Sequence, residues 1–573
     1  MKTQRPIHCG KRGGYALMIV LVFTCIALVM LAGAMTWTST TATLTQRNNQ
    51  YYNAAAAAEA ATEKVISQMA RDFQMQGQAA VDYNLANYRA AVPTTAESAT
   101  WADFAFSDAQ GNGAQTYVNK TFDWAYTPLQ SQYVGLYGLA ATYRIVSNAR
   151  AASGLNTNLI AGVKQEIQVS SIPLFQFAIF YSMDMELNPG ANMNITGRVH
   201  TNGHLYTQPN SATLTYQGDV TAVQEVEEDD KDPDDPTSRN PGSVVFQGAH
   251  DSGVSSLNLP IGTNNSPAAV HAVVELPPAG EDPNSPMGQQ RYYNKADLVI
   301  LVSNDVVVAT SGSWDGFGIA VPWAQASSFL NTNVTFYNAR ENKTVQATQL
   351  DVGALAQWST TNSVVRPLLG RDVSSVFVAD ERAPSSGTEP GVRLVNGQSL
   401  PALGLTVATP DPLYVQGNYN APSAYLGTTN TTTTLPASLV SDAITILSPA
   451  WSDANSTKSL TSRTAANSTV NAAIISGIVP SGNGHYSGGV ENFPRFLENW
   501  SGKTFTYNGS IVGMFSSQIA TGPWGGSGVY NPPNRNWAFD QNFMNASKLP
   551  PGTPMIRAII RACWALVAPN TTS

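Results

Sequence analysis

The clearest pattern in the chain is an apolar run close to its N-terminus. The 20 residues from Ala16 to Met35 contain no charged side chain. An α-helix rises about 1.5 Å per residue, so this run is about 30 Å long and matches the hydrocarbon core of a bilayer. A cleavable secretory signal has an apolar region of only about 7–15 residues. The pattern therefore predicts a transmembrane helix over residues 15–35.

Helical periodicity continues beyond the apolar run. The segment 36–80 is rich in strong helix formers and contains no Pro, and no Gly before Gly77. Its apolar residues recur every three to four positions, a spacing that puts them on one helix face: Leu44, Tyr51, Tyr52, Ala55, Ala58, Ala61, Val65, Met69 and Phe73. We expect one long helix, half of it in the bilayer and half an amphipathic shaft packed on an exterior domain.

The rest of the chain has the short alternating pattern of β-strands. Within 93–173, the runs ATYRIVSNAR and AGVKQEIQVSSI alternate apolar and polar residues and are separated by the turn-rich GLNTN. This arrangement predicts an antiparallel pair in a small sheet.

From 174 to 530, short apolar strands recur between Gly and Asn corners, which favours a β-helix or solenoid-like exterior domain. A β-sandwich is the alternative. The fold class expected is thus mainly β with a long N-terminal α-helix. Residues 531–573 are expected to form a C-terminal closing segment. Two acidic or Pro-rich stretches, 225–242 and 275–290, are expected to be exposed loops.

Composition narrows the function classes. Charged residues are only 12% of the chain, about half the roughly 25% usual in globular domains, and 31 Lys+Arg against 39 Asp+Glu give a net charge of −8. Because no basic block follows the first dozen residues, nucleic acid is not expected as a partner. Of the three cysteines, Cys9 lies in a basic segment and Cys25 in the apolar run. Only Cys563 is left for the exterior, so no intramolecular disulfide is expected there.

Charge flanking the apolar run predicts its orientation. Four basic residues lie in the leader 1–14, and no further one occurs until Arg47. The positive-inside rule then puts the N-terminus in the cytoplasm and everything after Met35 outside.

The N-terminal segment resembles the type IV pilins and type II secretion pseudopilins, and within that group the PilX-like minor pilins. The resemblance rests on a short basic leader ending in Gly14, an aromatic residue at Tyr15, the transmembrane stretch, and the AAEAA sequence at 57–61. It implies that a prepilin peptidase cuts between Gly14 and Tyr15. It also implies that the helix first anchors the chain in the inner membrane and later packs against other pilin-like subunits, through residues such as Ala16, Leu17, Ile19, Leu21, Phe23, Leu28 and Met35.

The chain departs from major pilins at one position. Major pilins carry Glu at the fifth mature residue, where it is understood to pair with a neighbouring N-terminal amine, and this chain has Ile19 there. The departure is similar to the large minor pseudopilin assigned to filament tips. Several short sequence segments within 190–555 also resemble the exterior domain of large PilX-like proteins. They include GRVHTNGHLY at 197–206, GLTVATPDPLYVQGNYN at 404–420 and NRNWAFDQNF at 534–543.

Motifs for metal, phosphate or nucleophilic chemistry are incomplete. A calcium loop counted from Asp230 has Asp235 where Gly is needed and Pro241 where Glu is needed, so we expect a solvated loop, with loose calcium binding as the alternative. His200 and His204 have HxxxH spacing, but Asn202 and Gly203 between them indicate a turn. The SGKT sequence at 501–504 lacks the first Gly of a P-loop. Cys563 lies in the run RACWALV, which is more consistent with a packed strand or helix than with an activated thiolate. No catalytic, cofactor or metal site is predicted.

These observations predict a non-enzymatic minor pilin or pseudopilin-like protein. Its bulk would be periplasmic or on the cell surface, where it would serve in a pilus or secretion apparatus and contribute to adhesion. A permanently anchored adhesin or envelope scaffold is one alternative. A membrane-tethered enzyme acting on polysaccharides is another, because scattered carboxylates and Trp residues suit sugar chemistry: Asp184, Glu186, Asp380, Glu381, Asp453, Asp540, Trp451, Trp500, Trp524 and Trp537.

Overall fold

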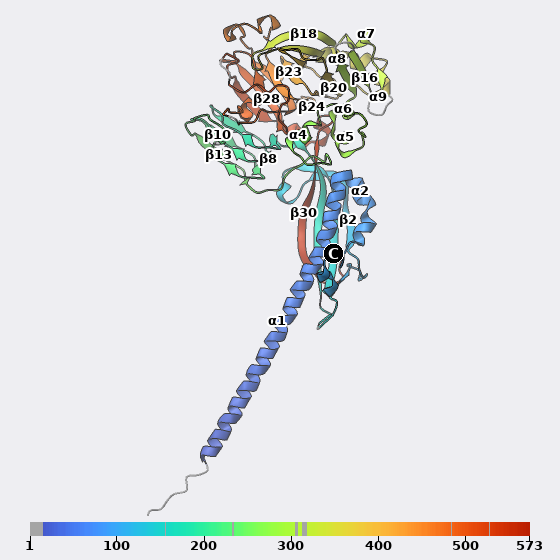
Figure 1. Cartoon of the computed structure of the whole chain (residues 1–573), viewed down its shortest axis with the longest axis vertical. Helices are drawn as coiled ribbons and strands as arrows, with labels where there is room; N and C mark the ends of the chain where they lie inside the picture. The colour runs from blue at the N-terminus through green and yellow to red at the C-terminus, as the bar shows by residue number, and fades with distance from the viewer. Residues whose placement is uncertain are drawn as a thin grey trace, which may run out of the picture.

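The structure is a computed structural model that describes residues 15–154, 156–231, 234–303, 307–311, 318–482, 484–525 and 528–572. It consists of a long helix that extends from a largely β body built of several sheets (Figure 1). The leader 1–14, including Gly14, lies outside the described residues.

One continuous helix, α1 (Tyr15–Gln76), forms the shaft. Its buried residues begin only at Ala54 and continue to Phe73. Leu44 and Tyr52, expected on the packed face, are 55% and 65% exposed, so that part of the prediction was wrong. The reason is length, because the sheet beneath the helix extends only far enough to cover its C-terminal third (Figure 1). Gly77, at φ 80°, ends α1 in a left-handed conformation, and α2 (Gln78–Tyr83) and α3 (Leu85–Arg89) follow.

The shaft packs on an antiparallel sheet. It contains β1 (Phe104–Ser107), β2 (Tyr117–Pro128), β3 (Tyr137–Ala151), β4 (Ile160–Pro173) and β30 (Met555–Val567). The expected antiparallel pair is present as β3 and β4, which pair from Leu139 with Ser171 to Arg150 with Ile160. The fifth strand was not expected. Part of the closing segment 531–573 returns from the far end of the chain as β30 and pairs with β4.

The next part of the body is built of three ladders of parallel strands. In the first ladder Ile179 pairs with Val199, Val199 with Val220, and Val220 with His250. The first ladder consists of β5 (Ile179–Tyr181), β8 (Val199–Thr201), β11 (Val220–Ala222) and β14 (His250–Asp251). The second consists of β6 (Met185–Glu186), β9 (Leu205–Tyr206) and β12 (Val226–Glu227). The third consists of β7 (Met193–Ile195), β10 (Thr213–Tyr216) and β13 (Ser243–Phe246).

Glycines mark one corner of these ladders. Gly197, Gly218 and Gly248 each precede a strand of the first ladder and stack on one another. A Cβ atom on Gly218 would lie 2.6 Å from the carbonyl carbon of Gly197, and one on Gly248 would lie 2.7 Å from that of Gly218. Successive turns therefore approach so closely that only glycine fits at this corner.

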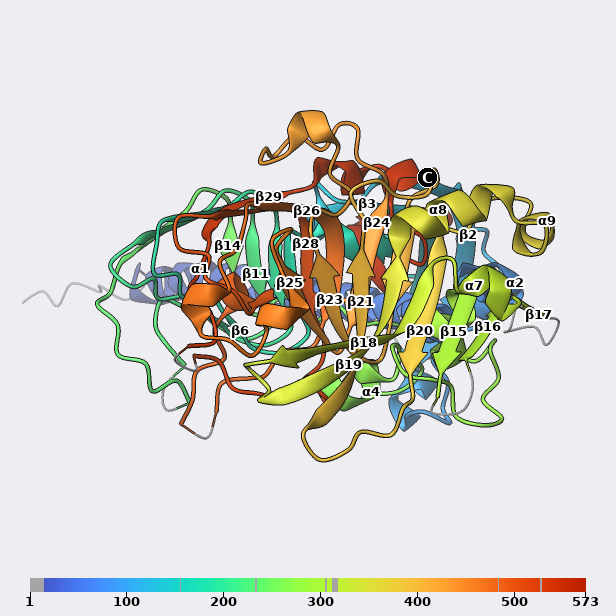
Figure 2. The same cartoon turned by 90° about the horizontal axis from the view of Figure 1, so that it is seen from above.

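The first ladder continues into the second half of the body through β28, which pairs with β5. The resulting sheet has 13 strands, and Figure 2 shows them side by side along the body. Its further strands are β15 (Leu298–Val302), β16 (Val307–Ser311), β17 (Ile319–Ala320), β20 (Ser375–Asp380), β22 (Leu405–Ala408), β24 (Ala437–Ser441), β26 (Ser468–Ser476), β28 (Thr504–Gly513) and β29 (Asn534–Phe539).

A six-stranded sheet lies next to it in the same half of the body. It contains β18 (Leu330–Asn338), β19 (Lys343–Asp351), β21 (Thr388–Val395), β23 (Pro412–Gln416), β25 (Ala443–Leu447) and β27 (Arg495–Phe496). Short helices fill the connections: α4 (Pro267–His271), α5 (Pro286–Gln290), α6 (Tyr292–Lys295), α7 (Trp323–Ala326), α8 (Val352–Thr361) and α9 (Val365–Leu369). One apolar core runs through both halves and takes residues from Leu129 to Ile560 along the sequence.

The two stretches expected to be exposed loops are partly ordered and buried. Within 225–242, Asp235 is almost fully buried and forms an ion pair with Arg239, and β12 belongs to a ladder. Within 275–290, α5 begins at Pro286 behind a Ser285 cap. The other described residues of both stretches are exposed or of intermediate burial, apart from Gly288. The ion pair of Asp235 joins positions whose contact a linear sequence does not reveal.

Candidate functional site

The first candidate site is the part of α1 that the chain itself leaves uncovered. Tyr15 is 82% exposed, and the expected anchor residues are exposed as well: Ala16, Leu17, Ile19, Leu21, Phe23, Leu28 and Met35. Among the described residues, α1 alone is long and apolar enough to cross a membrane, and none of its apolar window is buried. Such a surface requires an apolar partner, either lipid or other helices.

Threonine hydroxyls along this segment are satisfied within the helix. Thr24 donates to the carbonyl of Val20 at 2.8 Å, and Thr38 donates to that of Ala34 at 2.7 Å. Thr36, Thr40 and Thr43 make the same contact one turn back. These hydroxyls therefore need no water, which makes the segment compatible with an apolar or helix-lined environment.

Small residues hold the other end of α1 against the sheet. Ala57, Ala58 and Ala61 of the AAEAA sequence are fully buried against Phe106 and Val163. Because their side chains end at Cβ, the helix approaches the sheet closely along this row. The fit of small side chains explains why this stretch is rich in alanine.

Polar contacts join the same helix to the C-terminal strand. Arg561 of β30 donates to Glu63 Oε2 at 2.7 Å, and this hydrogen bond lowers the pKa of Glu63. Arg557 donates to the carbonyl oxygens of Phe73 and Gln74 at 3.0 and 2.8 Å, and its guanidinium lies 5.8 Å from the Phe73 ring centre. A strand from the far end of the sequence thus supplies the cation that caps the C-terminus of α1.

Arg557→Ala is expected to lower the free energy of unfolding of the helix and sheet unit by about 1–2 kcal/mol, because two terminal carbonyls of α1 lose their charged donor. Hydrogen exchange should speed up mainly over residues 70–76. Arg71→Ala is the matched control, because Arg71 lies on the same helix with a side chain 72% exposed. Equal exchange in the two variants would contradict the capping role.

The carboxylates proposed for sugar chemistry are dispersed over the body. Asp453 accepts hydrogen bonds from Arg393 at 2.6 Å and from the Trp451 indole at 2.8 Å. Asp540 accepts the hydroxyl of Thr431 at 2.7 Å and caps a short helix. Trp451 and Trp500 are buried in the apolar core, and Trp524 and Trp537 are partly buried. These groups have structural partners where they lie.

Asp380 and Glu381 line an open groove of about 620 Å³ together with Glu389, Asp411 and Arg382. Asp411 is almost fully buried and accepts the backbone N–H of Asp380 at 2.7 Å. Burial, and then the negative charge of Asp380, raise the pKa of Asp411 to about 8. Burial also raises the pKa of Glu389 to about 7.

These raised pKa values make stability depend on pH. Between about pH 4 and pH 8 the folded state holds a proton on Asp411 that the unfolded state has lost, so stability falls as pH rises through this window. In Asp411→Asn, the loss of unfolding free energy across this pH window is expected to be smaller than in the wild type by on the order of 2–4 kcal/mol. The profile of melting temperature against pH should be correspondingly flatter. Glu389 and Glu186, whose pKa values are both raised to about 7, leave a residual slope. The exposed neighbour Glu381→Gln is the control, and identical slopes for wild type and Asp411→Asn would contradict the prediction.

Of the two histidines of the HxxxH motif, one lies on a strand and the other in the turn that follows. His200, on β8, is stacked on Phe180 and contacts the Thr221 hydroxyl at 2.8 Å. Burial lowers the pKa of His200 to about 4, so the ring is neutral. His204, before β9, contacts Glu227 at 2.8 Å. In the part of the chain that the structure describes, no group of three or more His, Cys, Asp or Glu side chains has the arrangement of a metal site.

A second candidate site is a cavity of about 200 Å³ inside the body. Glu186 lines it from β6 and Asp184 from the turn before that strand. Arg340 lines it from the hairpin between β18 and β19, and Arg495 from β27. Asp184 forms an ion pair with Lys231 at 2.9 Å, and Glu186 accepts the Ser481 hydroxyl at 2.7 Å. Burial raises the pKa of Glu186 to about 7. Sequence reasoning named the two acids but missed the arginines, since nothing in the linear pattern brings positions 340 and 495 together.

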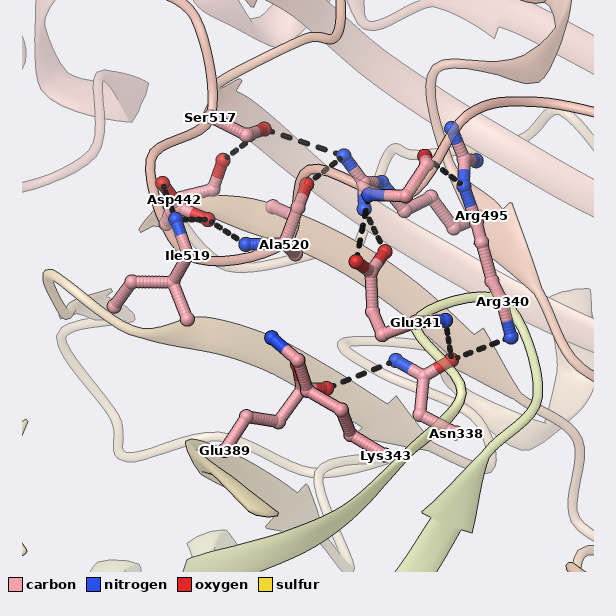
Figure 3. Close-up of polar contacts among 12 residues, drawn as sticks. Asn338, Arg340, Glu341, Lys343, Glu389, Asp442, Arg495, Ser517, Ile519 and Ala520 are labelled. Atoms are coloured by element: carbon pink, nitrogen blue, oxygen red, sulfur yellow. Dashed lines mark hydrogen bonds and ion pairs between the residues drawn. The ribbon is translucent and has the colours of Figure 1, made fainter. Parts of the chain in front are cut away.

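The basic side of this cavity is drawn in Figure 3. Arg495 pairs with Glu341 at 3.0 Å and donates to the carbonyl of Ala520 at 2.8 Å. Glu341 also accepts the backbone N–H of Gly522 at 2.6 Å. Beyond this pair, Asp442 accepts the backbone N–H of Ala520 at 2.9 Å. The loop after β28 is therefore tied to β27 and to the β18–β19 hairpin by buried charge.

Comparisons with known proteins provide little information about function. No family model matches the chain, and no curated protein matches it. Among solved structures, the competence-associated pilin ComZ from Thermus thermophilus aligns over 90% of this chain and 97% of its own, with 12% identity and a TM-score of 0.30. A likeness of this size carries no argument about function, so the functional argument rests on the geometry above.

Proposed function

We propose that the chain is a non-enzymatic minor pilin or pseudopilin-like component of a type IV pilus or related secretion apparatus. The observation that carries the proposal is the division of α1 into two parts. Residues 15–49 are exposed, whereas one face of the helix from Ala54 to Phe73 is buried against the antiparallel sheet. The helix α1 therefore connects the folded body to an apolar surface that requires partners.

The length of the uncovered segment favours assembly over simple anchoring. Crossing a bilayer takes about 20 residues, and the exposed part of α1 continues beyond that length through residues 36–49. This extra stretch carries the threonines whose hydroxyls bond back into the helix, and it provides a face for neighbouring helices. The partners proposed are other pilin-like subunits. Ile19, in place of the acidic residue of major pilins, supports a tip or minor position.

Processing and location are parts of the same proposal. A prepilin peptidase would cut between Gly14 and Tyr15. Before assembly the helix would cross the inner membrane once. Its N-terminus would be in the cytoplasm, and the body would be periplasmic or on the cell surface.

We also propose that the exterior domain is a β-solenoid. Three parallel ladders with successive rungs in register, and a stack of glycines at one corner, support this assignment over a β-sandwich, whose strands pair antiparallel.

The mature N-terminus tests the central proposal. The full chain is expressed with a prepilin peptidase, and its intact mass is measured with and without the peptidase. We expect loss of residues 1–14 only when the peptidase is present, and no loss in a Gly14→Val variant. Gly13→Val is the matched control and should be processed. An intact residue 1, or a cut at another bond, would overturn the pilin reading.

Location after shearing separates the proposal from a permanent anchor. In cells that form filaments, the processed chain is expected in the sheared filament fraction, and the Gly14→Val chain only in the membrane fraction. Recovery of both chains from the membrane alone would favour the anchored adhesin or scaffold instead.

A further inference from the structure

The cavity in the body contains a cation that its surroundings do not neutralise. The Arg340 side chain makes one hydrogen bond to the described residues, from Nε to the carbonyl of Gly522 at 3.1 Å. Its two terminal nitrogens have no acceptor among those residues, although the side chain lines the cavity. Figure 3 shows the guanidinium beside, and not paired with, the Glu341–Arg495 ion pair.

The neighbouring acid is already occupied. Glu341 uses one oxygen for Arg495 and the other for the backbone N–H of Gly522. Burial, and then the positive charge of Arg495, lower the pKa of Arg340 to about 9, and Glu341 offsets only part of this. A cation held in this way is stabilised by any anion that enters the cavity, because arginine presents a planar fork that matches a carboxylate.

The other walls restrict what that anion can be. Lys231 also lines the cavity and pairs with Asp184, which leaves Glu186 as the acid of the lining without an ion pair among the described residues. Its negative charge disfavours a dianion such as phosphate. Ser487 offers a hydroxyl group, and Tyr181 and Phe493 offer aromatic carbon. The Asn492 amide bonds Gly488, Tyr530 and Arg535 and has one N–H left for a ligand. A monoanion whose body carries several hydroxyl groups on a compact ring satisfies both sets of groups.

Cavity size points in the same direction. At about 200 Å³ it exceeds the roughly 150 Å³ cavity that takes a benzene-sized ligand, and it lies below the roughly 300–1,000 Å³ of sites for drug-sized ligands. One six-membered sugar ring with its substituents is of this size.

We propose that this cavity binds a single hexuronic acid unit, with the sugar carboxylate on Arg340 and its hydroxyls on the Glu186, Ser487 and Asn492 side. The site goes beyond the pilin proposal and does not depend on it. It gives the exterior domain a ligand of defined chemistry, an acidic sugar, free or at the end of a polysaccharide.

Calorimetric titration of the full chain tests the site. The chain is held in a polyoxyethylene detergent, because detergents with sugar head groups would compete. D-glucuronate is the probe. D-glucose has the sugar body without the carboxylate, and N-acetylalanine has a carboxylate without the sugar body. Sodium sulfate tests the contribution of negative charge alone. We expect saturable binding of glucuronate and at least tenfold weaker binding of the other three.

Arg340→Gln is expected to weaken glucuronate binding at least tenfold. Arg71→Gln, on the exposed face of α1, should leave it unchanged. Arg340→Lys keeps the charge without the fork and should bind with intermediate affinity. Because Arg340 lacks an anionic partner of its own, the Gln variant should melt at the same temperature as wild type or higher. A clear fall in melting temperature would show a structural role and overturn the proposal.

Three other results would also overturn it. They are the absence of saturable glucuronate binding, equal binding of glucuronate by Arg340→Gln and wild type, and binding of glucose, N-acetylalanine or sulfate as tight as that of glucuronate. The first two remove the site, and the third removes the assignment to an acidic sugar.

Discussion

Arg495→Ala is expected to lower the free energy of unfolding of the β body by about 3–5 kcal/mol. The substitution leaves the Glu341 carboxylate buried, with the Gly522 N–H as its remaining strong donor. It also removes the donor to the Ala520 carbonyl, so the loop after β28 loses a contact with β27. Urea unfolding followed by tryptophan fluorescence measures the change, because Trp500 is buried near β27.

A second substitution distinguishes loss of the pair from loss of packing. Glu341→Gln in the Arg495→Ala background removes the unpaired charge, so it should recover more than half of the lost stability. Arg393→Ala is a control at another ion pair, since its partner Asp453 is 36% exposed, and it should cost less. If Arg495→Ala changes stability by less than about 1 kcal/mol, the buried pair does not hold this region together.

Ala61→Glu is expected to detach α1 from the antiparallel sheet. Ala61 is fully buried against Phe106 and Val163, so a glutamate there must either bury its charge or push the helix away. Both routes cost several kcal/mol, comparable with the stability of a small domain. Limited proteolysis should then cut within residues 54–76, which resist cleavage in the wild type.

Ala56→Glu is the matched control for this prediction. Ala56 lies on the same helix five residues earlier, with its side chain exposed, and glutamate is a good helix former. The control should keep the wild-type cleavage pattern. Equal cleavage of both variants would mean that the shaft is not held by its alanine face.

Local patterns were sufficient to predict the long helix and the β3–β4 pair. An uninterrupted apolar run and an amphipathic continuation without Pro require no knowledge of distant contacts. The β3–β4 pair likewise joins neighbouring segments across a short turn. The same patterns were misleading at Leu44 and Tyr52, because amphipathic spacing shows which face is apolar but does not show how far the covering sheet extends.

Contacts between distant segments account for what the sequence did not reveal. β30 pairs with β4 across nearly 400 positions. The alternation of apolar and polar residues in a strand does not indicate which distant strand it pairs with. The same holds for the second candidate site. Arg340 is a candidate ligand-binding residue because Glu341, its immediate neighbour in the chain, pairs with Arg495 instead. This pairing can be seen only in the folded structure.

The return of β30 to the shaft has a mechanical consequence. The body is joined to the shaft unit by two strands of backbone, one leaving after Pro173 and one returning before Met555. They meet where the Leu174 N–H donates to the Pro554 carbonyl at 3.0 Å. A pulling force between body and helix is therefore divided between two covalent tethers side by side, and each continues into a long strand of the same sheet. Extension of one tether alone is opposed by the other, so traction should keep the body fixed against the shaft until β30 shears from β4 along its whole paired length. The backbone after Pro173 then remains as the single connection.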